Sequence, residues 1–335
     1  MSGSWKQRPE GGGRLALWMI RGVARHGGRG IGRALLYPIT LYFLLVRGPE
    51  RRASRAYLTR VLGHRASLWA VARHIHTFAS TILDRVFLLG GRFGGFDVRV
   101  TGLPELHEVL DRKQGVLLFG SHLGSFEVMR VLAQQRPDYQ IRVVLDKAHN
   151  PALTQMLDTL NPQIAAGVID AGQDGPSIAM AIKQATDEGA LVALLVDRAR
   201  AGEPALKAQF LGRDAPFPTA PWLIASALKV PVVLAFGLYQ GGHHYHLAFE
   251  SFSDSIAVPR QQRAQAVLSL IQRYAARLEH HARAAPYNWF NFYDFWGNED
   301  EGSAPSESDA PRIVAIDHAD ADADVQRRTS VRRSA

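Results

Sequence analysis

Val116-Leu-Leu-Phe-Gly-Ser-His-Leu-Gly-Ser-Phe-Glu127 is the segment that says most about the fold of this 335-residue chain. Its first part, residues 116–119, is a short apolar run typical of a buried strand, and residues 126–135 have the pattern of a helix. Gly120 and Gly124 permit a tight turn between the two. The segment therefore predicts a strand that leads through a sharp turn into a helix, with a histidine and a carboxylate beside the turn.

The same alternation of strand and helix continues along the chain. Further strands are predicted at 96–101, 141–145, 165–170, 190–196, 231–238 and 244–250, and further helices at 103–112, 150–160, 177–188, 220–229 and 259–285. The run at 190–196 is apolar throughout, which fits a strand buried on both faces. The sequence predicts an α/β fold with a mainly parallel central sheet flanked by helices.

Positive charge is concentrated at the N-terminus. Residues 1–55 carry ten arginines and Lys6 against Glu10 and Glu50, a net charge of +9 in a chain whose total is +8. An excess of arginine indicates an anionic partner, either nucleic acid or a phospholipid surface. Because apolar residues dominate between these arginines, a membrane surface is predicted and nucleic acid is not.

The apolar, aromatic-rich run at 31–46 lies within this basic region. A spanning helix needs roughly 20 apolar residues, and this run is shorter and contains Arg33 and Pro38. It therefore predicts an interfacial or shallowly embedded helix; the alternative is a core helix behind a basic tail.

Four regions are predicted on these grounds. They are a flexible N-terminus at 1–14, a helical membrane-associated segment at 15–92, an α/β domain at 93–296, and a disordered tail at 297–335 that is rich in Asp, Ser, Ala and Pro. The aromatic segment at 286–296 has two interpretations, a membrane-facing belt or a C-terminal flap packed on the core.

Several classes of chemistry are excluded or disfavoured. The chain has no cysteine, so it has no disulfide, thiolate nucleophile or cysteine-based zinc site. Gly120-Ser-His-Leu-Gly124 lacks the G-x-S-x-G spacing of a nucleophile elbow, which argues against a serine hydrolase. On a strand, only His244 and His246 of the histidine-rich 243–246 stretch would share a face. A hairpin or loop is preferred there, and no metal site is predicted.

His122 and Glu127 are the candidate catalytic pair. Within one helix, five steps of about 100° would leave the two side chains about 140° apart. They can converge if His122 lies in the loop before the helix and Glu127 in its first turn, at the sheet edge where open α/β folds bind ligands. A carboxylate on one imidazole nitrogen would leave the other free to accept a proton. Spacing alone favours the alternative, a helix-capping His122 and a surface Glu127, because His-x4-Glu often occurs by chance.

Ser121-His-Leu-Gly-Ser-Phe-Glu127 resembles the His-x4-Asp/Glu block of the lysophospholipid acyltransferase superfamily. The likeness is greatest to the bacterial lipid A late acyltransferases, which add lauroyl or myristoyl chains. It extends over roughly residues 15–296 and includes the apolar helix at 31–46 and the segments 58–63, 74–78, 195–198, 210–212, 217–221 and 286–296.

Two segments depart from that family's pattern. Asp197-Arg198 stands where Asp-Gln is common, and 286–296 lacks the arginines of the usual Trp-x-x-(His)-Arg-Arg-Phe block. In both respects the chain is similar to the acyltransferases of aryl-polyene or related pigment and glycolipid clusters. The sequence thus leaves three alternatives for the acceptor: a lipid A precursor, another membrane glycolipid or a pigment lipid.

The resemblance implies transfer of a fatty acyl group from an acyl carrier protein thioester, or from acyl-CoA, to an acceptor hydroxyl at the cytoplasmic face of the bacterial inner membrane. It implies no cofactor beyond this co-substrate. His122 would be the general base and Glu127 its orienting carboxylate, with Arg130, Asp197 and Arg198 in the acceptor site. The alternative for Arg130 is a salt bridge to Glu127. The alternatives for the whole chain are a catalytically silent membrane-binding protein and a hydrolase that uses the same pair on water.

Overall fold

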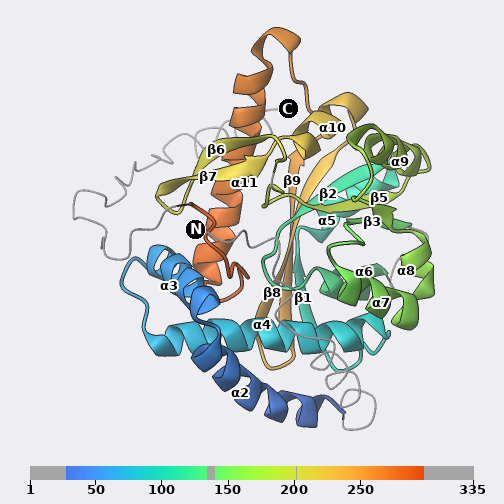
Figure 1. Ribbon diagram of the computed structural model, residues 1–335. Helices are drawn as coiled ribbons and strands as arrows, with labels where there is room; N and C mark the ends of the chain where they lie inside the picture. The colour runs from blue at the N-terminus through green and yellow to red at the C-terminus, as the bar shows by residue number, and fades with distance from the viewer. Residues whose placement is uncertain (1–27, 113, 134–139, 201, 298–335) are drawn as a thin grey trace, which may run out of the picture. The chain divides into compact units, whose positions relative to one another are not determined.

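A seven-stranded sheet forms the centre of the computed structural model (Figure 1), which describes residues 28–112, 114–133, 140–200 and 202–297. The strand order is β1-β9-β8-β2-β5-β3-β4. Only β8 and β9 pair antiparallel within this sheet; its other described pairs are parallel. The strands are β1 (Asp97–Thr101), β2 (Val116–Gly120), β3 (Ile141–Leu145), β4 (Ile169–Asp170), β5 (Leu191–Leu195), β8 (Val232–Gly241) and β9 (His244–Ser253). The predicted mainly parallel sheet is confirmed.

Helices cover both faces of this sheet, which explains why β2 is buried at every position. Leu117 and Phe119 face the core formed with α9 (Gly175–Asp187), α10 (Ala220–Leu228) and α11 (Arg263–Ala284). Val116 and Leu118 face the opposite core, to which α5 (Leu103–Asp111) contributes. Side chains that alternate along a strand point to opposite faces, so a strand between two helical layers must be apolar throughout.

Three N-terminal helices form a layer of their own. They are α2 (Gly28–Val46), α3 (Gly48–Leu62) and α4 (Leu68–Leu89), and Figure 1 shows α2 lying beside α4 on the side away from the sheet. Within the predicted helical segment 15–92, residues 68–89 form one continuous helix, α4. It begins at Ser67, whose hydroxyl accepts a hydrogen bond from the Ala70 N–H.

The structure differs from the predicted elements in three places. The strand predicted at 165–170 is reduced to β4 because α8 (Pro162–Ala166), which is capped by Asn161, takes its first two residues. The helix after His122 is a short 3₁₀ turn, η2 (Phe126–Met129), followed by α6 (Arg130–Ala133). The hairpin of β6 (Ala205–Phe210) and β7 (Arg213–Pro218) was not predicted.

Other elements complete the described chain. They are α7 (Pro151–Leu160) and the 3₁₀ turn η3 (Arg260–Gln262) before α11. The predicted flexible N-terminus at 1–14 and the part of the predicted tail beyond Gly297 lie outside the described residues.

Candidate active site

Parallel pairing of β2 with β5 brings His122 and Asp197 together. Gly120 and Leu195 are partners in this pairing, and each functional residue lies two positions beyond its strand's last paired residue. Both side chains therefore lie at the carboxyl edge of the sheet, where open α/β sheets bind ligands. The imidazole Nδ1 of His122 is 2.8 Å from Oδ1 of Asp197.

The Asp197 carboxylate is fully buried and has a donor at each oxygen. Its Oδ2 accepts the backbone N–H of His122 at 3.1 Å and the indole N–H of Trp289 at 3.0 Å. Burial by itself would raise the pKa of this carboxyl, but His122, the Arg198 guanidinium and the Trp289 indole together hold the pKa well below its usual range. Asp197 is therefore ionised at neutral pH and holds the His122 ring from its buried side.

The imidazole of His122 has the form that a general base requires. An ionised carboxylate only accepts hydrogen bonds, so Nδ1 carries the proton and Nε2 has a free lone pair. In the described part of the chain Nε2 has no hydrogen-bond partner, and 39% of the side-chain surface is exposed. Burial of the rest of the ring, then the positive charge of Arg198, lowers the pKa of His122. The ring is therefore neutral at pH 7.

Glu127 lies in η2 and faces α4 rather than His122. Its Oε1 is 2.6 Å from Nε of Arg85, and its Oε2 accepts the Ser125 hydroxyl at 2.9 Å. The orienting carboxylate expected at Glu127 is thus Asp197 in this structure. The Arg85–Glu127 pair is nevertheless close to the site, because the Arg85 charge also lowers the pKa of His122.

Arg130 anchors the end of α4. Its guanidinium donates to the carbonyl oxygens of Leu88 and Leu89 at 2.7 and 2.6 Å, and it lies 5.6 Å from the ring centre of Phe93. The Leu88 carbonyl also accepts the Gly91 N–H at 3.2 Å, so the arginine adds to the capping of this helix end. No ion pair joins Arg130 to Glu127, although both residues are described.

Two glycines let the His122 loop lie directly against β8. Gly124 has φ +76°, and a Cβ on it would lie 1.9 Å from the carbonyl oxygen of Gly237. A Cβ on Gly237 would lie 2.0 Å from the carbonyl oxygen of Ser125. Any larger residue at either position would push the loop that carries His122 away from β8.

The aromatic segment 286–296 packs on the core beside the site. Trp289 and Asn291 are fully buried, the Phe290 N–H donates to the His122 carbonyl at 2.9 Å, and Arg198 donates to the Phe290 carbonyl. The guanidinium of Arg198 also lies 5.4 Å from the ring centre of Tyr293. Of the two interpretations of this segment, a membrane-facing belt and a C-terminal flap packed on the core, the structure shows the flap. Trp289, which contacts Asp197, was not identified from the sequence.

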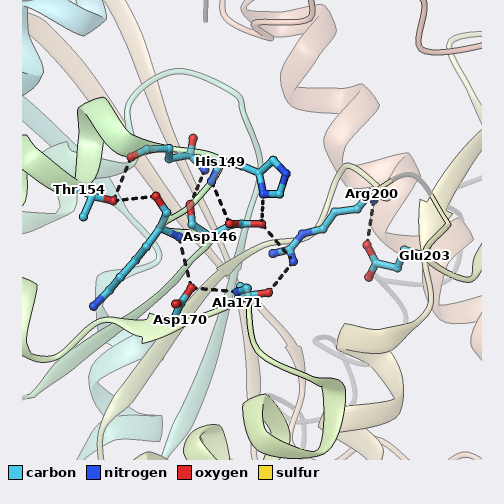
Figure 2. A network of polar contacts seen from close by, with 10 residues as sticks. Asp146, His149, Thr154, Asp170, Ala171, Arg200 and Glu203 are labelled. Carbon is cyan, nitrogen blue, oxygen red and sulfur yellow. Dashed lines mark hydrogen bonds and ion pairs between the residues drawn. The ribbon is translucent and has the colours of Figure 1, made fainter. Parts of the chain in front are cut away.

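A second polar network lies at the same sheet edge (Figure 2). Asp146, directly after β3, accepts the His149 backbone N–H at 3.1 Å and its ring Nδ1 at 2.9 Å, and it is 3.3 Å from Nη1 of Arg200. Arg200 also donates to the Ala171 carbonyl, while Asp170 accepts the N–H of Lys147. Three loops that follow β3, β4 and β5 are thereby tied together, which supports the loop that begins at Asp197.

In the histidine-rich stretch 243–246, His243 lies in the turn after β8 and residues 244–246 begin β9, as the hairpin interpretation predicted. His244 pairs with Asp97 at 2.9 Å and His246 with Thr101 at 3.0 Å. Within residues 28–112, 114–133, 140–200 and 202–297, no group of three or more metal-ligating side chains is found.

Comparison with protein families gives a match. Residues 68–297 match the family described as bacterial lipid A biosynthesis acyltransferase. The matched range begins at α4 and ends just after the aromatic flap, so it contains His122, Asp197 and Trp289. No curated protein matches the chain.

Proposed function

Since the chain belongs to the bacterial lipid A biosynthesis acyltransferase family, we propose that it transfers a fatty acyl group from an acyl carrier protein thioester to a hydroxyl of a lipid A precursor or related membrane glycolipid. The chain is an acyltransferase of this family; the donor, the acceptor and the residue roles are the proposal. One observation carries the residue roles: Nδ1 of His122 is held by the buried Asp197 carboxylate, and its Nε2 has no hydrogen-bond partner among the described residues. The donor and the acceptor are proposed from the family.

In the proposed reaction, Nε2 of His122 accepts the proton of the acceptor hydroxyl as its oxygen attacks the thioester carbonyl carbon. Asp197 stabilises the resulting imidazolium, as the carboxylate does in Ser-His-Asp enzymes. Collapse of the tetrahedral intermediate breaks the C–S bond, and the departing thiolate takes the proton from His122. The products are the ester and the free thiol, and no covalent acyl-enzyme is needed.

Arg198 is our candidate for acceptor contact. Its side chain is 23% exposed beside His122, whereas Asp197 is fully buried and the guanidinium of Arg130 is committed to the end of α4. A guanidinium can donate to sugar hydroxyls or phosphate oxygens. We propose that Arg198 combines this contact with its hold on the flap.

We also propose that α2 lies in the surface of the cytoplasmic face of the inner membrane. The helix is long and apolar enough to span a bilayer by length and composition, but it is bound to the protein along its length. Gly32, Leu36 and Thr40 form its buried stripe, and Arg29 pairs with the buried Asp84 of α4 through two contacts of 2.7 Å. An interfacial position leaves these contacts intact while the opposite face enters lipid.

The opposite face of α2 is apolar and exposed. Its large side chains are between 42% and 70% exposed, and the neighbouring start of α4 adds two more; the residues are Ile31, Leu35, Tyr37, Leu41, Tyr42, Leu45, Val46, Leu68 and Trp69. This set is called the lipid surface below. An apolar face flanked by arginines is typical of helices that lie on anionic membranes.

Leu41→Asp combined with Leu45→Asp is expected to weaken binding to vesicles of phosphatidylglycerol and phosphatidylethanolamine at least about tenfold, since burying a leucine is worth about 1.5–3 kcal/mol. Vesicle co-sedimentation measures the change. Met180→Asp on α9 is the matched control, because Met180 is 66% exposed but lies outside the lipid surface. Equal binding by the double variant and the control would contradict an interfacial α2.

The proposed function is tested by incubating the purified full chain with lauroyl-acyl carrier protein and a lipid A precursor in vesicles. Mass spectrometry is expected to show a mass gain of one acyl chain on the acceptor. Release of free fatty acid without acceptor would indicate the hydrolase alternative, and no turnover with either acyl carrier protein or CoA donors would indicate a silent protein. Mass spectrometry of lipids from a deletion strain then identifies the acceptor, as the lipid that lacks one acyl chain.

A further inference from the structure

The Asp197 carboxylate has a fixed orientation because of the two donors at Oδ2. One is the backbone N–H of His122 and the other is the indole N–H of Trp289, and together they leave Oδ1 facing the imidazole. The backbone donor belongs to the loop that also carries the base. The indole is therefore the donor that ties this carboxylate to a different part of the fold.

Trp289 is itself held firmly. Its side chain is fully buried, with ring centres of Tyr57, Phe210 and Phe295 at 5.0, 5.1 and 4.9 Å. Its backbone forms an antiparallel β-bridge with Leu123, the residue that follows His122. Aromatic rings at such distances pack edge to face and restrict each other's rotation.

The N-terminal helices hold the backbone of Trp289. The fully buried His74 of α4 lies with Nε2 3.0 Å from the Trp289 carbonyl oxygen and with Nδ1 2.8 Å from the Ser54 hydroxyl of α3. A carbonyl only accepts, so Nε2 donates and Nδ1 accepts the hydroxyl proton. Burial lowers the pKa of His74 to about 4, so the ring stays neutral and works as a fixed link. Tyr57 adds a second link by donating to the Pro286 carbonyl at 2.8 Å.

We infer that Trp289 is a positioning residue for the His122–Asp197 pair, and that α3 and α4 hold it in place from the helical layer that borders the lipid surface. The inference rests on the proposed function for the identity of the base. The C-terminal flap thereby has a role: its Trp289 orients the buried carboxylate.

Trp289→Phe tests this inference because it removes the N–H and keeps an aromatic ring. We expect kcat to fall about 10- to 100-fold, as for loss of a hydrogen bond to a charged group, with little change in KM. A carboxylate that has lost a donor attracts the imidazolium more strongly, so the acid limb of the pH–rate profile is expected to move to higher pH.

Trp296→Phe is the matched control. Trp296 lies in the same segment, and its indole donates to the Phe210 carbonyl at 3.3 Å, away from Asp197. We expect its kcat to stay within about twofold of the parent's with an unchanged pH profile, since a neutral hydrogen bond of this kind contributes little. Thermal unfolding of both variants measures any loss of stability.

The pKa of His122 measured by NMR separates this inference from the proposed function. A rise in this pKa in Trp289→Phe, absent in Trp296→Phe, supports the positioning role even if the parent protein transfers no acyl group. Equal pKa values for His122 in the two folded variants overturn the positioning role, whatever the outcome of the acyl-transfer assay.

Discussion

Replacing His122 with glutamine is expected to lower kcat for acyl transfer about 10²–10⁴-fold, the range that a general base contributes. Glutamine occupies similar space, but its amide cannot take up the hydroxyl proton. Because the lost interaction forms in the transition state, KM is expected to change little. Initial rates with the acyl carrier protein donor measure the change.

The pH dependence adds a second signature of His122. Only the neutral ring is a base, so kcat/KM is expected to fall as pH drops through the pKa of His122 and to be flat at higher pH up to neutrality. Burial and Arg198 hold this pKa below 6.5, so the fall begins below the pH expected for a free histidine. The pH profile of kcat/KM for His122→Gln is expected to lack this fall at low pH.

His149→Gln is the matched control for His122→Gln. His149 lies at the same sheet edge and also donates from Nδ1 to an aspartate, but its side chain is 81% exposed and belongs to the second network. We expect its kcat to remain within about threefold of the parent's, as for an exposed polar substitution. Equal losses of kcat in the two variants would contradict the role of His122 as the general base.

Asp197→Asn is expected to lower kcat about 10³–10⁴-fold, as loss of the orienting carboxylate does in Ser-His-Asp enzymes. Two donors, the His122 backbone N–H and the Trp289 indole, face Oδ2. The amide NH₂ of asparagine cannot face these donors, so it would turn toward Nδ1 of His122. The ring would then carry its proton on Nε2 and could not act as a base. The kcat of this variant and an NMR assignment of the tautomer test the prediction.

Glu127 provides the contrast with Asp197. Because Glu127 pairs with Arg85, its loss leaves an unpaired positive charge near His122. We expect the effects of Glu127→Gln and Arg85→Gln on kcat to be strongly non-additive in the double variant. The effects of Asp197→Asn and Arg85→Gln on kcat are expected to be close to additive. Additive effects of the first pair would show that Glu127 acts on His122 directly, as the resemblance to the acyltransferase family implies.

The predicted elements succeeded where a local pattern decides the structure. Continuous apolar runs predicted β2 and β5, because a strand between two helical layers must be apolar on both faces. The β6–β7 hairpin was missed because its two-residue turn is formed by Leu211 and Gly212, with φ +52° and +79°. Leucine rarely adopts positive φ, so the sequence carries no turn signal of the usual kind there.

By itself, the sequence indicated the α/β fold class and the family and singled out His122 as the candidate base, because hydrophobic periodicity and a short motif are local properties of the chain. The family match over residues 68–297 confirms the resemblance. Only the tertiary structure decided which carboxylate meets His122. Asp197 lies 75 residues away in the chain, and it arrives through the register of two strands that are not consecutive. Trp289 reaches that carboxylate from the C-terminal flap, and His74 of α4 holds the Trp289 backbone. Both contacts exist only after the helical layer has packed on the sheet.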